Sequence, residues 1–177
     1  MPERFIASDF FREYRDLVGS KELSDMLEEY NVNMVVCLHP KFREFSGLLE
    51  SHSDRIRIFD HSECKINEML MKCSLFITDY SSAAWDVMYI DKPVLFYQFD
   101  IEKYNEWQGS YLDLRNKMFG YRAETFDVFL KELKRVLDNN FAESEGADAL
   151  KDRYLPVRDT NNCKRVYEEV LIMLGEQ

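Results

Sequence analysis

The stretch Leu75-Phe76-Ile77-Thr78-Asp79-Tyr80-Ser81-Ser82 is a short apolar run that changes abruptly into polar residues and two hydroxyls. The apolar part predicts a buried strand, and the following Ala83-Ala84-Trp85 is compatible with a helix. A strand ending in Ser-Ser at a helix N-terminus predicts an anion-binding turn, because the first helical N–H groups lack intrahelical acceptors and carry the positive end of the helix dipole. The alternative is that Ser81 or Ser82 only caps the helix.

A second polar pair follows another apolar run. Met34-Val35-Val36-Cys37-Leu38 predicts a buried strand and leads directly into His39-Pro40. Because ligands of open α/β sheets bind outside the carboxyl ends of the strands, His39 is predicted to face the same ligand as the two serines. Pro40 favours an extended His39 and ends the strand. A lone histidine at a strand end is more often packed or solvated, so the prediction depends on both clusters together.

The rest of the chain alternates between segments with the apolar pattern of a strand and segments with the apolar spacing of a helix. Strands are predicted at 34–38, 56–59, 75–78 and 94–97, and helices at 8–18, 20–30, 41–50, 62–72, 82–90, 125–139 and 162–174. This alternation predicts an α/β fold with a Rossmann-like parallel sheet flanked by helices. Residues 98–121 are interpreted as an aromatic loop along a cleft, and 143–146 as a surface connection. In the last helix Val166, Val170 and Leu171 are expected to turn inward.

Length and charge limit the function classes. The chain has 177 residues, which predicts one domain with a sizeable core. Its net charge of −10 argues against a broad nucleic-acid or anionic-membrane surface, so no nucleic-acid partner is expected and any phosphate site must be local. The four cysteines lack the spacing of metal ligands and are expected to be reduced, with no metal site. No membrane-spanning run or signal peptide is seen, which favours the cytoplasm.

Several segments in this order resemble the CDP-glycerol glycerophosphotransferase family of teichoic acid polymerases. They are His39-Pro40, Ile66-Asn67 with Leu70, Ile77–Ser82 with Asp86, Asp91–Tyr97 and Asp100–Tyr104. The resemblance implies a GT-B enzyme with two Rossmann-like domains facing each other across a cleft. Residues 1–177 would be its single C-terminal domain, which holds the donor nucleotide, and no cofactor is implied. The N-terminal half would then lie outside this sequence.

The resemblance also implies roles for individual residues. In the family pattern the His-Pro histidine and the paired serines contact the donor pyrophosphate, and these are His39, Ser81 and Ser82 here, with Pro40 and Asp79 beside them. His39 is also the expected catalytic residue. The closing pattern of the family is approximated by Asp159 and Arg165, which are added to the expected donor site. An arginine usual after Asp-x-x-x-Tyr is absent from Gln108-Gly109-Ser110-Tyr111, which leaves the donor's identity open.

The function implied is transfer of glycerol phosphate, or a similar polyol phosphate, from a CDP- or CMP-linked donor to a growing polymer of the wall or capsule. The polymer acceptor and the catalytic base are expected on the N-terminal domain. Two alternatives stay open, namely a nucleotide-sugar-dependent capsule glycosyltransferase and a non-catalytic nucleotide-binding module. The expected location is cytoplasmic, peripheral at the inner face of the plasma membrane through other parts of the complete protein. Asp79 has an alternative role as an Asx-turn residue.

Overall fold

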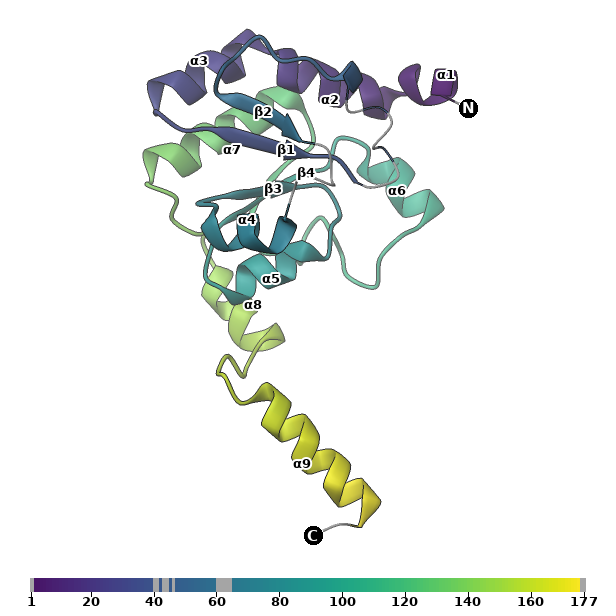
Figure 1. Ribbon diagram of the computed structural model, residues 1–177, viewed down its shortest axis with the longest axis vertical. Coiled ribbons are helices and arrows are strands. Elements are labelled where there is room, and N and C mark those ends of the chain that lie inside the picture. The colour runs from purple at the N-terminus through teal and green to yellow at the C-terminus, as the bar shows by residue number, and fades with distance from the viewer. Residues whose placement is uncertain (1, 40–41, 43–44, 46, 60–64, 176–177) are drawn as a thin grey trace.

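Five parallel strands, in one two-stranded and one three-stranded sheet, form the centre of the part of the molecule that the structure describes. The computed structural model describes residues 2–39, 42, 45, 47–59 and 65–175. Strand β1 (Met34–Cys37) pairs with β2 (Ile56–Phe59), and β4 (Val94–Tyr97) lies between β3 (Phe76–Thr78) and β5 (Tyr121–Ala123). All of these pairings are parallel, so the predicted α/β class with a parallel sheet flanked by helices is confirmed (Figure 1).

Helices precede, connect and follow the strands of the described chain. They are α1 (Pro2–Ile6), α2 (Asp9–Gly19), α3 (Lys21–Glu29), α4 (Ile66–Lys72), α5 (Ala83–Tyr89), α6 (Ile101–Trp107), α7 (Phe126–Asp138), α8 (Ala147–Tyr154) and α9 (Asn162–Leu174). Serine or threonine hydroxyls cap α2, α3 and α7, where the side chain accepts from a backbone N–H of the first turn.

The central strand β4 is buried on both faces, and alternate residues enter different cores. Leu95 and Tyr97 join a core built from α2, α3, α7 and the β1–β2 pair, whereas Val94 and Phe96 join a second core under α4, α5 and α8. A side-chain period of two along the strand sends neighbours to opposite faces. Both faces of β4 are covered by helices, so apolar side chains are needed at every position of the strand.

Four short elements are not predicted by the sequence. Helix α6 and strand β5 lie in or directly after the stretch interpreted as a loop, and α1 and α8 have no clear periodic signal. Tertiary contacts stabilise these elements. Ile101 of α6 and Tyr121 of β5 are buried by residues distant in the sequence, which local periodicity does not reveal. The helix expected at 41–50 is replaced, at the described positions 42, 45, 47 and 48, by 3₁₀ turns. Part of the helix expected at 62–72 falls outside the described residues.

A buried lysine ties α8 to the rest of the domain. Lys151 is 1% exposed, and its Nζ donates to Oδ1 of Asp91 over 2.7 Å and also to the carboxylate of Glu143. Burial alone would lower the pKa of Lys151, but the two hydrogen-bonded carboxylates raise it above the usual value. The surface connection predicted at 143–146 therefore contributes a partner to a buried charge.

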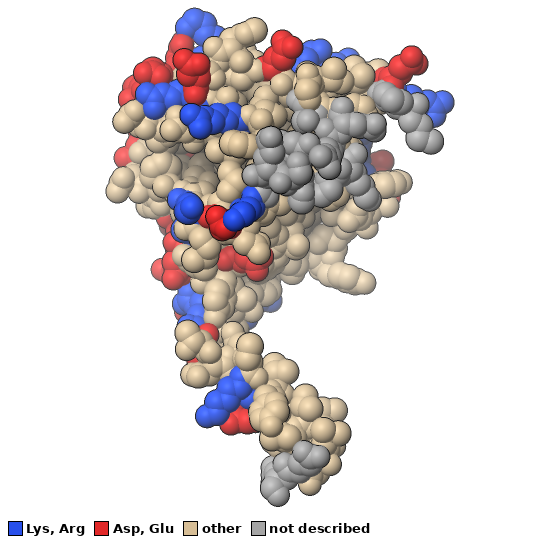
Figure 2. Space-filling view, viewed as in Figure 1, with Lys and Arg blue, Asp and Glu red and all other residues tan. Residues whose placement is uncertain are grey.

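The expectation that α9 turns an apolar face inward is wrong. In the described part of the chain α9 buries no residue, and it extends away from the sheet in Figure 1. Val166 is 65% exposed and Met173 is 85% exposed. Figure 2 shows mostly uncharged surface along this helix, with its charged side chains near its start. The amphipathic spacing does mark a helix, but the described chain supplies no surface for it to cover.

The expectation of reduced cysteines is wrong for Cys37. Cys37, the last residue of β1, is disulfide-bonded, whereas Cys73 and Cys163 are free. Sequence spacing identifies metal-ligand motifs but does not report which thiols meet in space. Over the described residues, no helix is both long enough and apolar enough to cross a membrane.

Gly120 is predicted to be the glycine least tolerant of substitution. Its φ is +87°, and an added Cβ would lie 2.5 Å from the backbone oxygen of Val94. Gly146 has a similar φ of +79° but no atom within 4 Å of that position. We expect Gly120→Ala to lower the free energy of unfolding by about 1–3 kcal/mol more than Gly146→Ala, because only Gly120 adds a clash to the φ penalty. Urea unfolding of both variants measures the difference, and equal losses would contradict the steric argument.

Candidate functional site

The predicted anion-binding turn has a defined geometry. Residues 79–82, here called the serine turn, connect β3 to α5. The Oγ of Ser81, one residue before the N-cap, accepts from the N–H of Ala83, the first residue of α5, over 3.2 Å. Ser82 occupies the N-cap position, yet no side-chain capping bond is found there among the described residues. Both serines are exposed, so a ligand can reach both hydroxyls.

Asp79 bonds the backbone of the next residue, whereas the Asx turn of the alternative interpretation needs a bond to the N–H two residues on. Its Oδ1 accepts from the backbone N–H of Tyr80 over 2.6 Å, and its Oδ2 lies 3.5 Å from the hydroxyl of Tyr14. Burial, and then the negative charge of Asp79, raise the pKa of Tyr14 well above the usual value. Tyr14 therefore stays protonated and faces the carboxylate as a donor.

Two further tyrosines are paired with carboxylates close by. The Tyr80 hydroxyl donates to Oδ1 of Asp100 over 2.8 Å, and the Tyr97 hydroxyl donates to Glu13. In both phenols burial is the larger cause and the carboxylate the second cause of a raised pKa. The carboxyl edge of the sheet is thus lined with neutral donors that satisfy acids, rather than with free charges.

His39 follows β1 of the two-stranded sheet, whereas the serine turn follows β3 of the three-stranded sheet. His39 is exposed, and its ring centroid is 6.2 Å from that of Phe42. Ring contacts continue from Phe42 to Phe10 at 5.4 Å and from Phe10 to Tyr14 at 4.8 Å, and Tyr14 reaches the serine turn through Asp79. A continuous aromatic layer therefore joins the end of β1 to the end of β3. Pro40 lies outside the described residues.

Asp159 and Arg165 lie elsewhere in this chain. Arg165 donates to both oxygens of Asp159 over 2.9 and 3.0 Å, and this pairing lowers the pKa of Asp159 and raises that of Arg165. The backbone oxygen of Asp159 accepts from the Tyr89 hydroxyl at the C-terminal end of α5. The serine turn lies at the opposite end of α5, so the structure does not bring these two residues to it.

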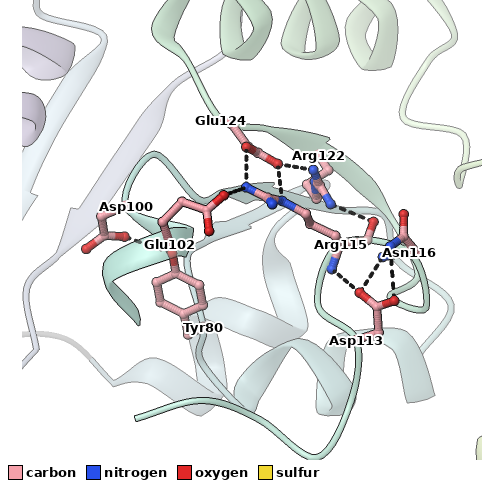
Figure 3. A network of polar contacts seen from close by, with 8 residues as sticks. All are labelled: Tyr80, Asp100, Glu102, Asp113, Arg115, Asn116, Arg122 and Glu124. Carbon is pink, nitrogen blue, oxygen red and sulfur yellow. Dashed lines mark hydrogen bonds and ion pairs between the residues drawn. The ribbon is translucent and has the colours of Figure 1, made fainter. Parts of the chain in front are cut away.

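The stretch where the family arginine is absent is followed by another arginine, Arg115. Figure 3 shows it between two acids, with Glu102 of α6 at 2.6 Å and Glu124, just after β5, at 3.1 Å. Arg122 also contacts Glu124 and the backbone oxygen of Arg115. This network holds the segment after α6 against β5, which explains why residues interpreted as a partly ordered loop have a defined course.

A hollow of about 290 Å³ lies away from the serine turn. It is lined by Gly120, Tyr121, Arg122, Glu132, Arg135, Ser144 and Glu145. Gly120 precedes β5, so the hollow is at the amino edge of the strands, whereas α/β ligands bind at the carboxyl edge. The serine turn is therefore the better candidate site. Over the described residues no group of three or more His, Cys, Asp or Glu side chains is arranged to hold a metal ion.

Residues that sequence reasoning misses also lie at this edge. Gln98 and Asp100 closely follow β4, so the rule that places His39 and the serines after their strands would find them too. The sequence pattern assigns Tyr14 to a core stripe, although a buried tyrosine needs a partner for its hydroxyl. The signal for Glu13 is absent from the sequence, because its contact to Tyr97 joins residues far apart in the chain.

Parallel strands between two helical layers, with a polar turn at their carboxyl edge, define the α/β class that binds ligands at that edge. The family model described as CDP-Glycerol:Poly(glycerophosphate) glycerophosphotransferase matches residues 11–172, and the chain belongs to this family.

Individual relatives and solved structures agree. The chain is 27% identical over 169 residues to the minor teichoic acid biosynthesis protein GgaB of Bacillus subtilis strain 168, covering 95% of this chain and 18% of that protein. It is 25% identical to the teichoic acid ribitol-phosphate polymerase TarK of Staphylococcus aureus strain NCTC 8325, covering 86% and 29%. A structure of the wall teichoic acid polymerase TagF matches with a TM-score of 0.62 and 21% identity, over 88% of this chain and 38% of that one. The chain thus spans less than a third of these two curated relatives.

The two serines are expected to differ in their effect on stability. Ser81→Ala removes the bond to the Ala83 N–H and should lower the free energy of unfolding by about 0.5–2 kcal/mol. Ser82→Ala removes no capping bond and should change it by less than about 0.5 kcal/mol. Urea unfolding of both variants checks the assignment. A larger loss for Ser82→Ala than for Ser81→Ala would show that the cap is misassigned.

Proposed function

We propose that this chain is the donor-nucleotide domain of an enzyme that transfers glycerol phosphate, or a similar polyol phosphate, from a CDP-linked donor to a growing wall or capsule polymer. The family match over residues 11–172 carries the proposal. The exposed serine hydroxyls and the exposed His39, which follow the carboxyl ends of two parallel strands, support it, because such ends are where α/β proteins bind ligands.

In the proposed reaction a terminal hydroxyl of the acceptor attacks the donor phosphorus next to the polyol. A new P–O bond forms, the P–O bond to CMP breaks, and CMP leaves with that electron pair. The hydroxyl proton passes to a base on the other half of the enzyme. Here His39, Ser81 and Ser82 stabilise the charge that grows on the departing phosphate, which is where a preorganised donor is most effective.

Ser81 and Ser82 can both donate to phosphate. A hydroxyl has one donor and two acceptor positions, so Ser81 can hold the Ala83 N–H as acceptor while its own O–H points to the ligand. Among the described residues Ser82 makes no side-chain capping bond, so phosphate binding by its hydroxyl would not compete with a bond to the helix. We expect phosphate binding to stay local because the chain carries a net charge of −10.

The proposal includes a two-domain enzyme of which this chain is one half. A TagF structure of which it covers 38% supports that arrangement. A second TagF structure, of a variant soaked with CDPG, matches with a TM-score of 0.57 and supports a CDP-linked donor. The exposed apolar side chains of α9 suit packing against the other half. We place the complete enzyme in the cytoplasm, peripheral at the inner face of the plasma membrane.

Calorimetric titration with CDP-glycerol, CMP and UDP-glucose tests the donor site on this chain. We expect heat with both cytidine nucleotides and little with UDP-glucose. Ser82→Ala should weaken CDP-glycerol by about tenfold or more, since a hydrogen bond to a charged group contributes about 1.5–3 kcal/mol. The matched control Ser74→Ala changes an exposed serine before β3 and should leave affinity unchanged. Tighter binding of UDP-glucose would favour the glycosyltransferase alternative, and no binding by folded protein would overturn the site.

The catalytic role of His39 is tested in the complete enzyme by primer extension. His39→Ala should abolish most transfer, because the imidazole stabilises charge that grows in the transition state. His39→Gln should recover part of it through a neutral hydrogen bond. His52→Ala, at an exposed histidine before β2, is the control and should retain full activity. Wild-type turnover by His39→Ala would show that the role is misassigned.

A further inference from the structure

Gln98 is the first residue after β4 and is fixed on every side. Its relative exposure is 0%. Its backbone N–H donates to the oxygen of Ala123 over 2.8 Å, which extends the pairing with β5, and its backbone oxygen accepts from the N–H of Ile101 over 3.3 Å at the start of α6. Its side chain therefore projects from a rigid junction rather than from a loop.

The side-chain amide of Gln98 is directed at the serine turn. Nε2 donates to the backbone oxygen of Asp79 over 3.2 Å. The opposite amide orientation would set Oε1 against that carbonyl, two acceptors facing each other, so the assignment of nitrogen to this side follows from the chemistry. Within the part of the chain that the structure describes, the buried Oε1 has no hydrogen-bond partner.

A buried acceptor without a partner reduces stability, because its desolvation is not compensated. Methionine has nearly the length of glutamine and no polar tip, so it would fill the same space without that cost. For the fold alone the two side chains are closely balanced at position 98, because methionine would remove the unpartnered Oε1 but would also take the Nε2 donor away from the Asp79 carbonyl. What the amide provides is one directional bond to the serine turn, two residues before Ser81.

Residues 98–104 also hold Tyr80, the next residue of the serine turn. The Tyr80 ring stacks on the Tyr104 ring with centroids 3.7 Å apart and planes within 9° of parallel, and the Tyr80 hydroxyl donates to Asp100. Helix α6, which carries Tyr104, is itself anchored through Lys103 to Asp9 of α2 and through Glu102 to Arg115 (Figure 3). The backbone just before the serines is thus held by residues 98–104.

We propose that Gln98 is a positioning residue for the donor phosphates, which fixes the Asp79 carbonyl and thereby the direction in which the serine turn presents its hydroxyls. This inference rests on the proposed function. Gln98 does not touch the ligand, since its side chain is fully buried behind the turn. Its effect on binding passes through the backbone of residues 79–82.

The test is Gln98→Met, with thermal unfolding and CDP-glycerol titration on the same samples. We expect the melting temperature to stay within a few degrees of the wild-type value, because removal of the unpartnered Oε1 offsets loss of the donor to the Asp79 carbonyl. Affinity for CDP-glycerol should weaken about three- to tenfold, the range of one lost neutral hydrogen bond. Gln108→Met, the same substitution at an exposed site beyond α6, should change neither quantity.

Tyr80→Phe provides a second variant in case Gln98→Met does not fold. It keeps the ring stack on Tyr104 and removes only the hydroxyl bond to Asp100. We expect about a two- to fivefold loss of affinity, on the order of a weak hydrogen bond, at an unchanged melting temperature.

The outcomes separate this inference from the function on which it rests. Wild-type affinity in Gln98→Met, with weak binding in Ser82→Ala, would leave the donor site standing and overturn the positioning role. A lower melting temperature with unchanged affinity per folded molecule would assign Gln98 to the fold alone and overturn the role as well. If the wild-type chain binds no CDP-glycerol, the proposed function fails, and this inference fails with it.

Discussion

Burial of β4 on both faces is the constraint on which the rest of the structure depends. Val94 and Phe96 enter one core, Leu95 and Tyr97 the other, and β3 and β5 pair on either side. A strand enclosed in this way has no freedom to shift its register, because a shift by one residue would exchange the two cores. Whatever follows β4 is therefore held in a fixed place, and Gln98 follows it directly.

Near the serine turn, the carboxylates are paired with neutral tyrosine hydroxyls. The tyrosine hydroxyls near the serine turn are donors to carboxylates, and burial together with those carboxylates raises the pKa of Tyr14, Tyr80 and Tyr97. The acids at this edge are thus satisfied internally. The exposed hydroxyls of Ser81 and Ser82 remain for a ligand, which suits a chain whose net charge of −10 leaves no general attraction for phosphate.

Helix α9 and the pair Asp159–Arg165 do not contribute to the core or to the serine turn in the described chain. The helix has the amphipathic spacing of a packed element but buries nothing in the described chain, and its first-turn arginine neutralises Asp159 away from the serine turn. An amphipathic stripe predicts that one face of a helix packs against another surface, but it does not identify the element or domain that provides that surface.

The sequence by itself determined the α/β alternation, the parallel sheet and the placement of His39 and the serines after their strands, because side-chain periodicity and strand ends are local properties. It did not show that the Ser81 hydroxyl accepts from the Ala83 N–H while Ser82, at the N-cap, makes no side-chain capping bond among the described residues. Nor did it predict α6, β5, the disulfide at Cys37 or the hold of Gln98 on the serine turn. Those features join residues distant in the chain, and only tertiary packing decides which distant groups meet.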